Sequence, residues 1–458
     1  MRIGLESLGD VVDPSTGRTT PAGELRSRIL RRRDEYLAAG LRPGDRVLLR
    51  HGNSPRFLID LLAVWSAEGC AAPADPALPA PEFEAVLKET GCSFVSSGDA
   101  IRFIGRVDCG SADARLLLLT SGTSGRPKAI LHSFQGLQSR FRAWGSRIKA
   151  GDLSETLCFL PTHFGHGLLA NCLFPLLQGA RLHVVPPFDF NLLATLDQYV
   201  DRHSITFMSS VPSAWNLITR FAESPRQGSL KRIHCASAPF PADLWKVVER
   251  WGGDAAFVNC YGLTEVASWV ASTEGCPGAR DTGCVGRAWD AQFEIREGEV
   301  WVRADSLMLG YHGRPELTAR VVRDGWLNTG DLGRIDAEGR IFLTGRTGTL
   351  INKAGMKISP EEVEAVMKGH PAVSEVCVFG LPDPLSGETV AAAVVFAGSV
   401  PAPHFEDLEA WCRERISPFK VPTRWFGLDA LPKTSNGKPD RRSLVNRFKE
   451  EGRHGSGT

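Results

Sequence analysis

Residues 120–128, TSGTSGRPK, combine hydroxyls, glycines and cations in a pattern suited to binding phosphate. Glycine allows the backbone to approach a ligand closely, and successive N–H groups form a nest for an anion. Hydroxyls donate hydrogen bonds to phosphate oxygens, and the lysine adds a positive charge. Pro127 and Ala129 flank that lysine, so the loop does not follow the Walker pattern. We predict a polyphosphate-binding loop made of Thr120, Ser121, Gly122, Thr123, Ser124, Gly125 and Lys128.

Four later stretches carry groups that complement a nucleotide. In residues 259–265, NCYGLTE, an amide can read the edge of a base, an aromatic ring can stack on the base, and a carboxylate can hold Mg²⁺. Asp331, in residues 328–331, offers a carboxylate to ribose hydroxyls. Residues 236–239 and the lysine turn 432–438 complete the set. Taken alone, each stretch also has an ordinary structural explanation. Residues 236–239 are typical of a turn, Tyr261 of a buried tyrosine, Asp331 of a helix cap and Lys438 of a surface lysine.

Composition excludes several classes of protein. The chain has 458 residues and a formal net charge of +1, with acidic and basic residues interspersed, so it lacks the basic footprint of a nucleic-acid-binding protein. Its 11 cysteines include no C-x-x-C pair, which argues against a zinc ribbon or a disulfide framework. The first residues lack the apolar core of a signal peptide, and no apolar run is long enough to span a bilayer. We expect a cytoplasmic protein without a membrane span.

Alternating strand and helix patterns position these stretches. Such alternation indicates parallel sheets covered by helices, with ligands bound at the carboxyl ends of the strands. The four leucines at 116–119 predict a strand buried on both faces just before the phosphate loop. Further strands are predicted at 46–50, 93–96, 157–160, 181–185, 205–208, 232–236 and 255–259, and helices at 24–40, 55–69, 82–91, 167–177, 191–202, 212–222 and 241–251.

The pattern changes after Gly286. Residues 292–303 and 332–344 alternate apolar and polar side chains, with a hairpin signal at 337–339. Residues 358–448 then mix short helices and strands. We predict an α/β protein with a large N-terminal domain, residues 1–347, of doubly wound α/β sheets with a small β-barrel-like part. A small mobile α+β C-terminal domain, residues 348–450, and a disordered tail, residues 451–458, follow.

Together, the motifs resemble those of the adenylate-forming superfamily, which includes acyl-CoA synthetases, firefly-type luciferases and the adenylation domains of peptide synthetases. The resemblance covers about residues 24–447, and five motifs occur in the order of the family. It implies an ATP-dependent, AMP-forming ligase that makes an acyl-adenylate and transfers the acyl group to a thiol, with coenzyme A as the first choice. Transfer to a carrier protein or an amine is the alternative within the class. A non-catalytic nucleotide-binding relative is the alternative from another class.

The resemblance also implies roles for individual residues, with ATP, Mg²⁺ and coenzyme A as cofactors. Asn259 would bond the adenine amine, and Tyr261 would pack on the adenine face. Asp331 would hold the ribose hydroxyls, Glu265 would bind Mg²⁺, and Lys438 would bridge the carboxylate and the α-phosphate. Catalysis is assigned to Lys438, Thr264 and Glu265. Nucleotide binding, besides the loop, is assigned to Ala236, Ser237, Ala238, Asn259, Cys260, Tyr261, Gly262, Thr264, Asp331 and Arg346.

The acid site is predicted from the same resemblance. Gly165 stands where amino-acid-activating relatives carry an aspartate, so the acid should lack an α-amino group. His163 and His166 suggest a polar or acidic tail; a metal site is the less favoured interpretation, because no third ligand is evident. Gly348 occupies the hinge position two residues after Arg346 and should ease backbone rotation. The acid is expected to contact Phe164, His166, Ser209, Val211, Gly262 and Val266, with Ala236 and Cys260 beside them.

Overall fold

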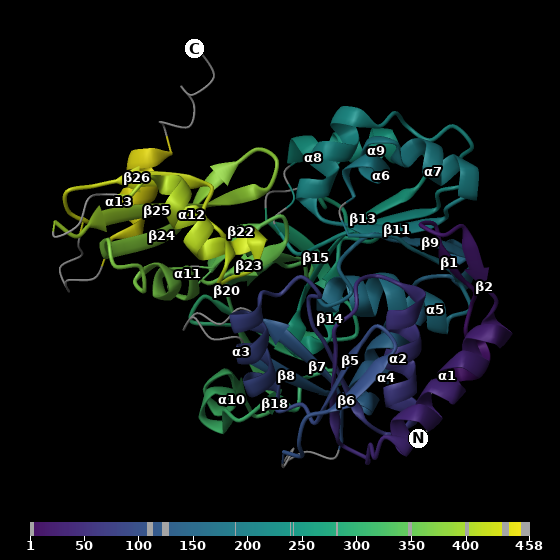
Figure 1. Ribbon diagram of the computed structural model, residues 1–458. Helices are drawn as coiled ribbons and strands as arrows, with labels where there is room; N and C mark the ends of the chain where they lie inside the picture. The colour runs from purple at the N-terminus through teal and green to yellow at the C-terminus, as the bar shows by residue number, and fades with distance from the viewer. Residues whose placement is uncertain are drawn as a thin grey trace. The chain divides into compact units, whose positions relative to one another are not determined.

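The structure, a computed structural model, describes residues 4–107, 113–120, 128–187, 189–238, 240, 242–280, 283–346, 350–398, 403–432 and 439–449. The chain forms two compact units. The first comprises Met1–Pro76, Leu87–Leu119 and Ala129–Thr347, and the second comprises Ala77–Val86, Thr120–Lys128 and Gly348–Thr458. Figure 1 labels the helices and strands and colours them along the chain from purple to yellow.

The smaller of the two sheets in the first unit has seven strands, in the order β18-β8-β7-β4-β3-β5-β6. Parallel pairing joins β5 to β3, β3 to β4 and β4 to β7, as the alternating pattern predicts. The strands are β3 Arg46–Leu49, β4 Cys70–Pro73, β5 Phe94–Ser97, β6 Ala100–Phe103, β7 Ala114–Thr120, β8 Lys128–Ser133 and β18 Gly310–Tyr311. Neighbouring helices in the chain are α1 Ala22–Ala38, α2 Pro55–Ser66, α3 Ala80–Thr90 and α4 Phe134–Gly145. The predicted phosphate loop therefore joins β7 to its neighbour β8.

The larger sheet has fourteen strands, and its first half is parallel from β1 and β10 through β9, β11 and β12 to β13. These strands are β1 Val11–Asp13, β9 Glu155–Cys158, β10 Arg181–Val184, β11 Phe207–Ser210, β12 Arg232–Cys235 and β13 Ala256–Leu263. At the edge, β2 Arg18–Thr20 pairs antiparallel with β1. Helices α6 Phe190–Ala194, α7 Leu196–His203, α8 Pro212–Phe221 and α9 Ala242–Gly252 lie over one face of them (Figure 1). The π-helix His166–Leu173, which continues into α5 Phe174–Leu177, contacts β9, β11 and β14 Ser268–Ser272.

The second half of the larger sheet is antiparallel and contains the segments that were expected to form a small barrel. Its strands are β14, β15 Cys284–Ala288, β16 Gln292–Arg296, β17 Glu299–Arg303, β19 Val322–Arg323, β20 Trp326–Ile335 and β21 Ile341–Arg346, with α10 Pro315–Val321 before β19. The hairpin predicted at residues 337–339 connects β20 to β21. Within the described residues these strands do not close on themselves. Instead, β15 pairs with β14, so the chain extends the open sheet.

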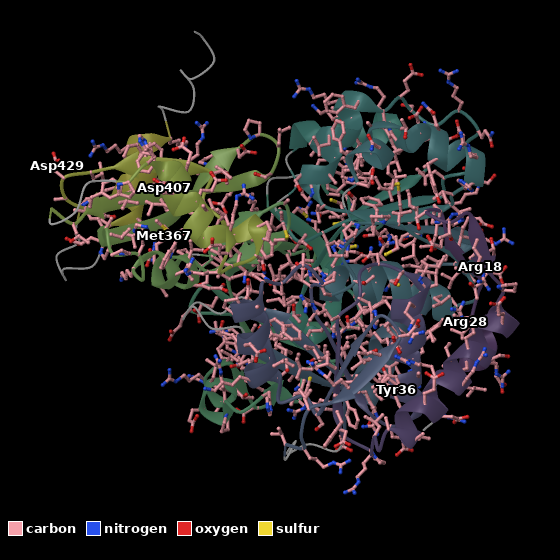
Figure 2. The ribbon with its side chains drawn as sticks, in the orientation of Figure 1. Arg18, Arg28, Tyr36, Met367, Asp407 and Asp429 are labelled. Carbon is pink, nitrogen blue, oxygen red and sulfur yellow. The ribbon has the colours of Figure 1, made fainter. Side chains whose placement is uncertain are left out.

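The C-terminal part of the second unit carries a five-stranded sheet with helices. Its strands are β22 Ile351–Lys353, β23 Met356–Ile358, β24 Val373–Asp383, β25 Gly387–Phe396 and β26 Arg424–Gly427, and its helices are α11 Pro360–Met367, α12 Phe405–Arg413 and α13 Arg441–Phe448. Met367 on α11 and Asp407 on α12 are labelled in Figure 2. Met367 packs in the core of this unit, whereas Asp407 accepts a hydrogen bond from the backbone N–H of His404 and so caps α12.

The α/β architecture is confirmed, and the differences are local. The helix predicted at 191–202 is broken at Thr195, whose non-helical φ of −125° separates α6 from α7. The helix predicted at 167–177 begins as a π-helix, in which Asn171 donates a side-chain hydrogen bond to the carbonyl of Leu157. Helix α4 was not predicted, although Ser133 caps it by accepting the N–H of Gly136 at 3.0 Å. Among the described residues, no helix is long and apolar enough to cross a membrane.

Candidate active site

The site is built at the end of β13, where the larger sheet changes from parallel to antiparallel pairing. The hydroxyl of Tyr261 on β13 donates a hydrogen bond to Asp331 Oδ2 on β20 at 2.6 Å, and both side chains are buried. The backbone N–H of Asp331 donates to Thr329 Oγ1 at 3.1 Å, and Thr329 in turn donates to the carbonyl of Val300. Two of the predicted stretches, 70 residues apart, thus form one group.

Asn259 is held through both its backbone and its side chain. Its N–H donates to Thr273 Oγ1 at 2.9 Å, and its carbonyl accepts the N–H of Thr273 at 2.9 Å. Its side-chain Nδ2 donates to the carbonyl of Cys284 at 3.4 Å. Because Asn259 is also buried, its amide is fixed in one orientation beside Tyr261. A fixed amide is what the selective recognition of a base edge requires.

Glu265 lies in the short turn η4, Thr264–Val266, directly after β13. Tyr311 donates its hydroxyl to Glu265 Oε1 at 2.8 Å, and the N–H of Met308 donates to the Glu265 carbonyl at 2.8 Å. Burial, together with the nearby Glu265 carboxylate, raises the pKa of Tyr311, so this hydroxyl stays a donor at neutral pH. A carboxylate has about four acceptor positions, so a single hydroxyl orients Glu265 and leaves capacity for a cation.

Gly262 is required by the close approach of β14. A Cβ atom at this position would lie 1.9 Å from the carbonyl oxygen of Ser268. The strand pairing shifts register between Tyr261 and Gly262, and such an irregularity bends a strand. The glycine therefore shapes the turn that presents Thr264 and Glu265.

His132, on β8, lies beneath this turn. It is buried and hydrogen-bonds to the backbone of Thr264. Burial lowers the pKa of His132 to about 4, in spite of that bond, so the ring is neutral at physiological pH. Among the described residues, its Nε2 atom has no hydrogen-bond partner. A neutral imidazole can support Thr264 without placing a positive charge under the site.

His166, at the start of the π-helix, joins the ends of two parallel strands. Its Nε2 lies 2.7 Å from Ser209 Oγ on β11, and its Nδ1 lies 3.0 Å from Ser237 Oγ, just after β12. The ring centroid of His166 lies 5.4 Å from that of Trp269, edge-on, and the ring centroid of His234 lies 4.8 Å from that of the same tryptophan. We call these five residues, His166, Ser209, Ser237, His234 and Trp269, the His166 cluster. Sequence reasoning had placed His166, Ser209 and Ser237 near the ligands, and the structure brings them together.

The other residues of the predicted site are distributed as follows. Ala236 and Cys260 are buried on β12 and β13 or at their ends, and Cys260 Sγ lies 3.8 Å from His234 Nδ1. Val211 and Val266 belong to hydrophobic core clusters, so the role that the structure shows for them is packing in the core. Phe164 is partly exposed and packs against His163. Thr120 is the last residue of β7, and Lys128 is the first residue of β8. Ala238 comes directly after Ser237 in the chain, and Arg346 on β21 pairs in register with Asp331 on β20. Ser121, Gly122, Thr123, Ser124, Gly125 and Lys438 lie outside the described residues.

Comparison with known proteins gives the family of the chain. Residues 24–102 and 103–312 match the AMP-binding enzyme family, and residues 362–438 match the AMP-binding enzyme C-terminal domain. The chain belongs to the AMP-binding enzyme family. It is an adenylate-forming acid–thiol ligase of the acyl-CoA synthetase type.

Two curated relatives and one solved structure illustrate the similarity. An oxalate–CoA ligase from Arabidopsis thaliana is 31% identical, and the match covers 90% of each chain. A feruloyl-CoA synthase from an Amycolatopsis species is 31% identical, over 93% of each chain. The amide bond synthetase McbA from Marinactinospora thermotolerans superposes with a TM-score of 0.85 at 25% identity, over 97% of this chain and 98% of that one.

The supporting residues of this AMP-binding enzyme were missed by sequence reasoning. Tyr311, Thr273 and Cys284 contact the predicted residues from strands or loops that carry no recognisable motif. His132 lies four residues after Lys128, the last residue of the predicted phosphate loop, and this proximity was its only signal. His234 lies on β12, and Ala236 follows two residues later, just past the end of that strand, so the two-residue alternation of a strand links the two positions. That alternation is the signal that could have found it.

Tyr261→Phe tests the contact between β13 and β20. The variant loses the hydroxyl that donates to Asp331, so the carboxylate should be less well positioned for the nucleotide. A hydrogen bond to a charged group contributes about 1.5–3 kcal/mol, so we expect the KM for ATP to rise by roughly 10-fold. Steady-state pyrophosphate release measures this change. Tyr199→Phe, which removes a hydroxyl bonded to His183, serves as the control and should leave the KM unchanged.

Proposed function

We propose that this enzyme activates a carboxylic acid that has no α-amino group, using ATP bound by Asn259, Tyr261 and Asp331. The observation that carries the proposal is the 2.6 Å hydrogen bond between Tyr261 and Asp331, which combines an aromatic face and a carboxylate at one strand end. A carboxylate oxygen of the acid forms a bond to the α-phosphorus, and pyrophosphate leaves with the electron pair of the broken P–O bond. Thr264 and Lys438 would stabilise the charge that develops on the α-phosphate.

The geometry around Gly165 supports the absence of an α-amino group. A Cβ atom on Gly165 would lie 3.3 Å from Leu118 Cδ1, so the end of that core leucine side chain would have to shift by a few tenths of an ångström. An ammonium group brought to this position would therefore meet glycine and apolar surface instead of a carboxylate. Leaving such a charge without a partner is costly.

Glu265 fits a site for Mg²⁺. Its carboxylate is oriented by Tyr311 and lies next to Thr264 in the turn after β13. No group of three or more potential metal ligands occurs among the described residues, which suits Mg²⁺ because this ion is commonly held by one carboxylate together with substrate phosphates. When bound, the ion would neutralise charge on the phosphates. The role of the protein is to hold the Glu265 carboxylate in place.

Coenzyme A is the acceptor that we propose, because two curated relatives that match 90% or more of the chain are named as a CoA ligase and a CoA synthase. A second candidate is an amine acceptor, which the structural similarity to an amide bond synthetase favours. A carrier-protein thiol would use the same acyl-adenylate. Supplying a preformed acyl-adenylate with coenzyme A, a simple amine or a phosphopantetheinylated carrier protein separates the three, because each gives a product of different mass.

Pyrophosphate release tests the proposed function directly. With ATP, Mg²⁺ and a panel of carboxylic acids, at least one acid should release pyrophosphate and yield AMP on full turnover. Formation of ADP and orthophosphate instead would contradict adenylation. An α-amino acid as the preferred substrate would contradict the proposed acid class.

Glu265→Gln should raise the concentration of Mg²⁺ needed for half-maximal activity. An amide keeps the size of the side chain and can still accept the Tyr311 hydrogen bond, but a neutral oxygen binds Mg²⁺ more weakly than a carboxylate does. We expect an increase of roughly 10-fold, the lower end of the effects of disturbing metal-site groups. Titration with Mg²⁺ at saturating ATP measures it. Glu294→Gln, at an exposed pair with Arg296, is the matched control.

A further inference from the structure

The His166 cluster has polar groups but no charge of its own. Although part of its surface is exposed, the His166 ring is packed among protein atoms, and this burial lowers its pKa to about 3. Burial also lowers the pKa of His234, and the charge of Arg232 lowers it further. Both rings are therefore neutral at physiological pH. A neutral imidazole has one donor and one acceptor nitrogen, so one of the two serines donates to His166 and the other accepts from it.

Arg232, a cation that contacts the cluster, is already paired with a carboxylate. Arg232 lies 3.4 Å from His234 Nε2, on the same strand, but its guanidinium forms a 2.7 Å ion pair with Glu274 and lies 3.5 Å from Asp152. Arg140, behind Trp289, donates to the Trp289 carbonyl at 2.8 Å and to Ser306. A second carboxylate brought against the cluster would thus meet serine hydroxyls, neutral imidazoles and indole faces. None of these supplies the positive charge that a buried carboxylate requires.

We propose that the His166 cluster is a specificity element that admits acids with an uncharged acyl group and rejects acids whose acyl group ends in a second carboxylate. The inference rests on the proposed function, because it places the acyl group of the acid against the ends of β11 and β12. It also decides between the two tails suggested by the sequence: the two serine contacts of His166 favour a neutral polar or apolar acyl group over an acidic one.

The test compares paired acids that differ in whether the acyl group ends in a second carboxylate. Hexanoate is paired with adipate, and cinnamate with 4-carboxycinnamate, and kcat/KM for pyrophosphate release is measured for each. Wild-type enzyme should favour the monocarboxylate of a productive pair by about 100-fold or more, as expected when binding buries a charge without a partner. Acyl-sulfamoyl adenosines with the same tails, measured by calorimetry, should show the same preference in binding without turnover.

Two variants at His166 separate charge from structure. His166→Gln keeps one donor and one acceptor without charge, and should retain the preference for monocarboxylates. His166→Lys introduces an ammonium group, and should shift the ratio by at least about 10-fold towards the dicarboxylate. Ser210→Ala is the matched control, because Ser210 adjoins Ser209 on β11 but has its hydroxyl directed to the carbonyl of Val211 at 3.4 Å. It should leave the ratio unchanged.

The outcomes distinguish this inference from the proposed function. Equal or better binding of the carboxylate-tailed sulfamoyl adenosine by wild-type protein overturns the inference, whether or not either variant folds. A dicarboxylate as the preferred substrate overturns it as well. Formation of ADP in place of AMP would instead contradict the proposed function, while calorimetry would still report on the selection by charge.

Discussion

Lys438→Ala should slow formation of the acyl-adenylate by roughly 10²–10³-fold or more, the loss expected when one positioned group that stabilises transition-state charge is removed. Acyl transfer from a supplied acyl-adenylate to coenzyme A should be largely spared. The prediction rests on the motif at residues 432–438, which resembles the lysine motif of the family and lies in its C-terminal domain match. In the first half-reaction the carboxylate, the α-phosphate and the leaving pyrophosphate are all anionic, so a lysine has most to contribute there.

The two half-reactions are measured separately. Pyrophosphate exchange into ATP reports the first, and thioester formation from a supplied acyl-adenylate reports the second. Lys433→Ala, in the same motif, is the control for a general loss of positive charge and should leave both rates close to wild type. Equal loss of both half-reactions in Lys438→Ala would contradict the assigned role and would favour a structural role for this lysine.

The sequence predicted the parallel half of the larger sheet well because its strands are short, apolar runs between helices with clear amphipathic patterns. Ile205 and Thr206 were expected within a strand, yet the strand begins at Phe207 and continues to Ser210. Ser209 and Ser210 are fully buried in the structure, but their polar side chains did not match the apolar pattern from which a buried strand is predicted. The part expected to be barrel-like does not close into a barrel among the described residues, and the reason is different. An alternating pattern specifies which face is buried, but not whether the last strand pairs with the first or with a neighbouring sheet.

The site was predictable where chemistry is local in sequence. Asn259, Tyr261 and Glu265 fall within seven residues, and Asp331 ends the short motif at residues 328–331, so these stretches taken together indicated a nucleotide-binding site. Their supports could not be predicted, because Tyr311 reaches Glu265 across 46 residues by a pairing that only the folded sheet creates. The protonation state of His166 could not be predicted from the sequence either. A histidine in a sequence can be neutral or cationic, and the packing around the ring decides which.

Asp60→Asn should destabilise the first unit by about 3–5 kcal/mol, the effect of breaking a buried ion pair. Asp60 lies on α2, with its side chain inaccessible to solvent. It forms an ion pair with the buried Arg32, accepts the hydroxyl of Tyr36 at 3.0 Å, and lies 2.9 Å from His51 and 3.0 Å from Arg56. Figure 2 labels Tyr36, which lies on α1. The amide is nearly the same size, so the loss is electrostatic, and Arg32 keeps only its ion pair with the half-exposed carboxylate of Glu35, at 2.7 Å, among the described residues.

The same network predicts a pH dependence. Burial alone would raise the pKa of Asp60, but hydrogen bonds from His51 and Arg32 and the charges of Arg32 and Arg56 outweigh it, and the pKa falls from 3.8 to about 2. Because the folded-state pKa is depressed, the contribution of this carboxylate is fully present above about pH 4 and is lost as the pH falls towards 2. The lost part amounts to about 2 kcal/mol.

Urea denaturation followed by tryptophan fluorescence measures both effects. At pH 7 the Asp60→Asn midpoint should lie well below that of the wild type, and the gap should narrow as the pH is lowered below about 4, because protonated Asp60 then resembles the amide. Asp99→Ala is the matched control: this carboxylate also contacts Arg56, at 2.8 Å, but is almost fully exposed, so solvent screens the pair and little change is expected. A gap that stays constant between pH 7 and pH 3 would contradict the charged network and attribute the loss to packing.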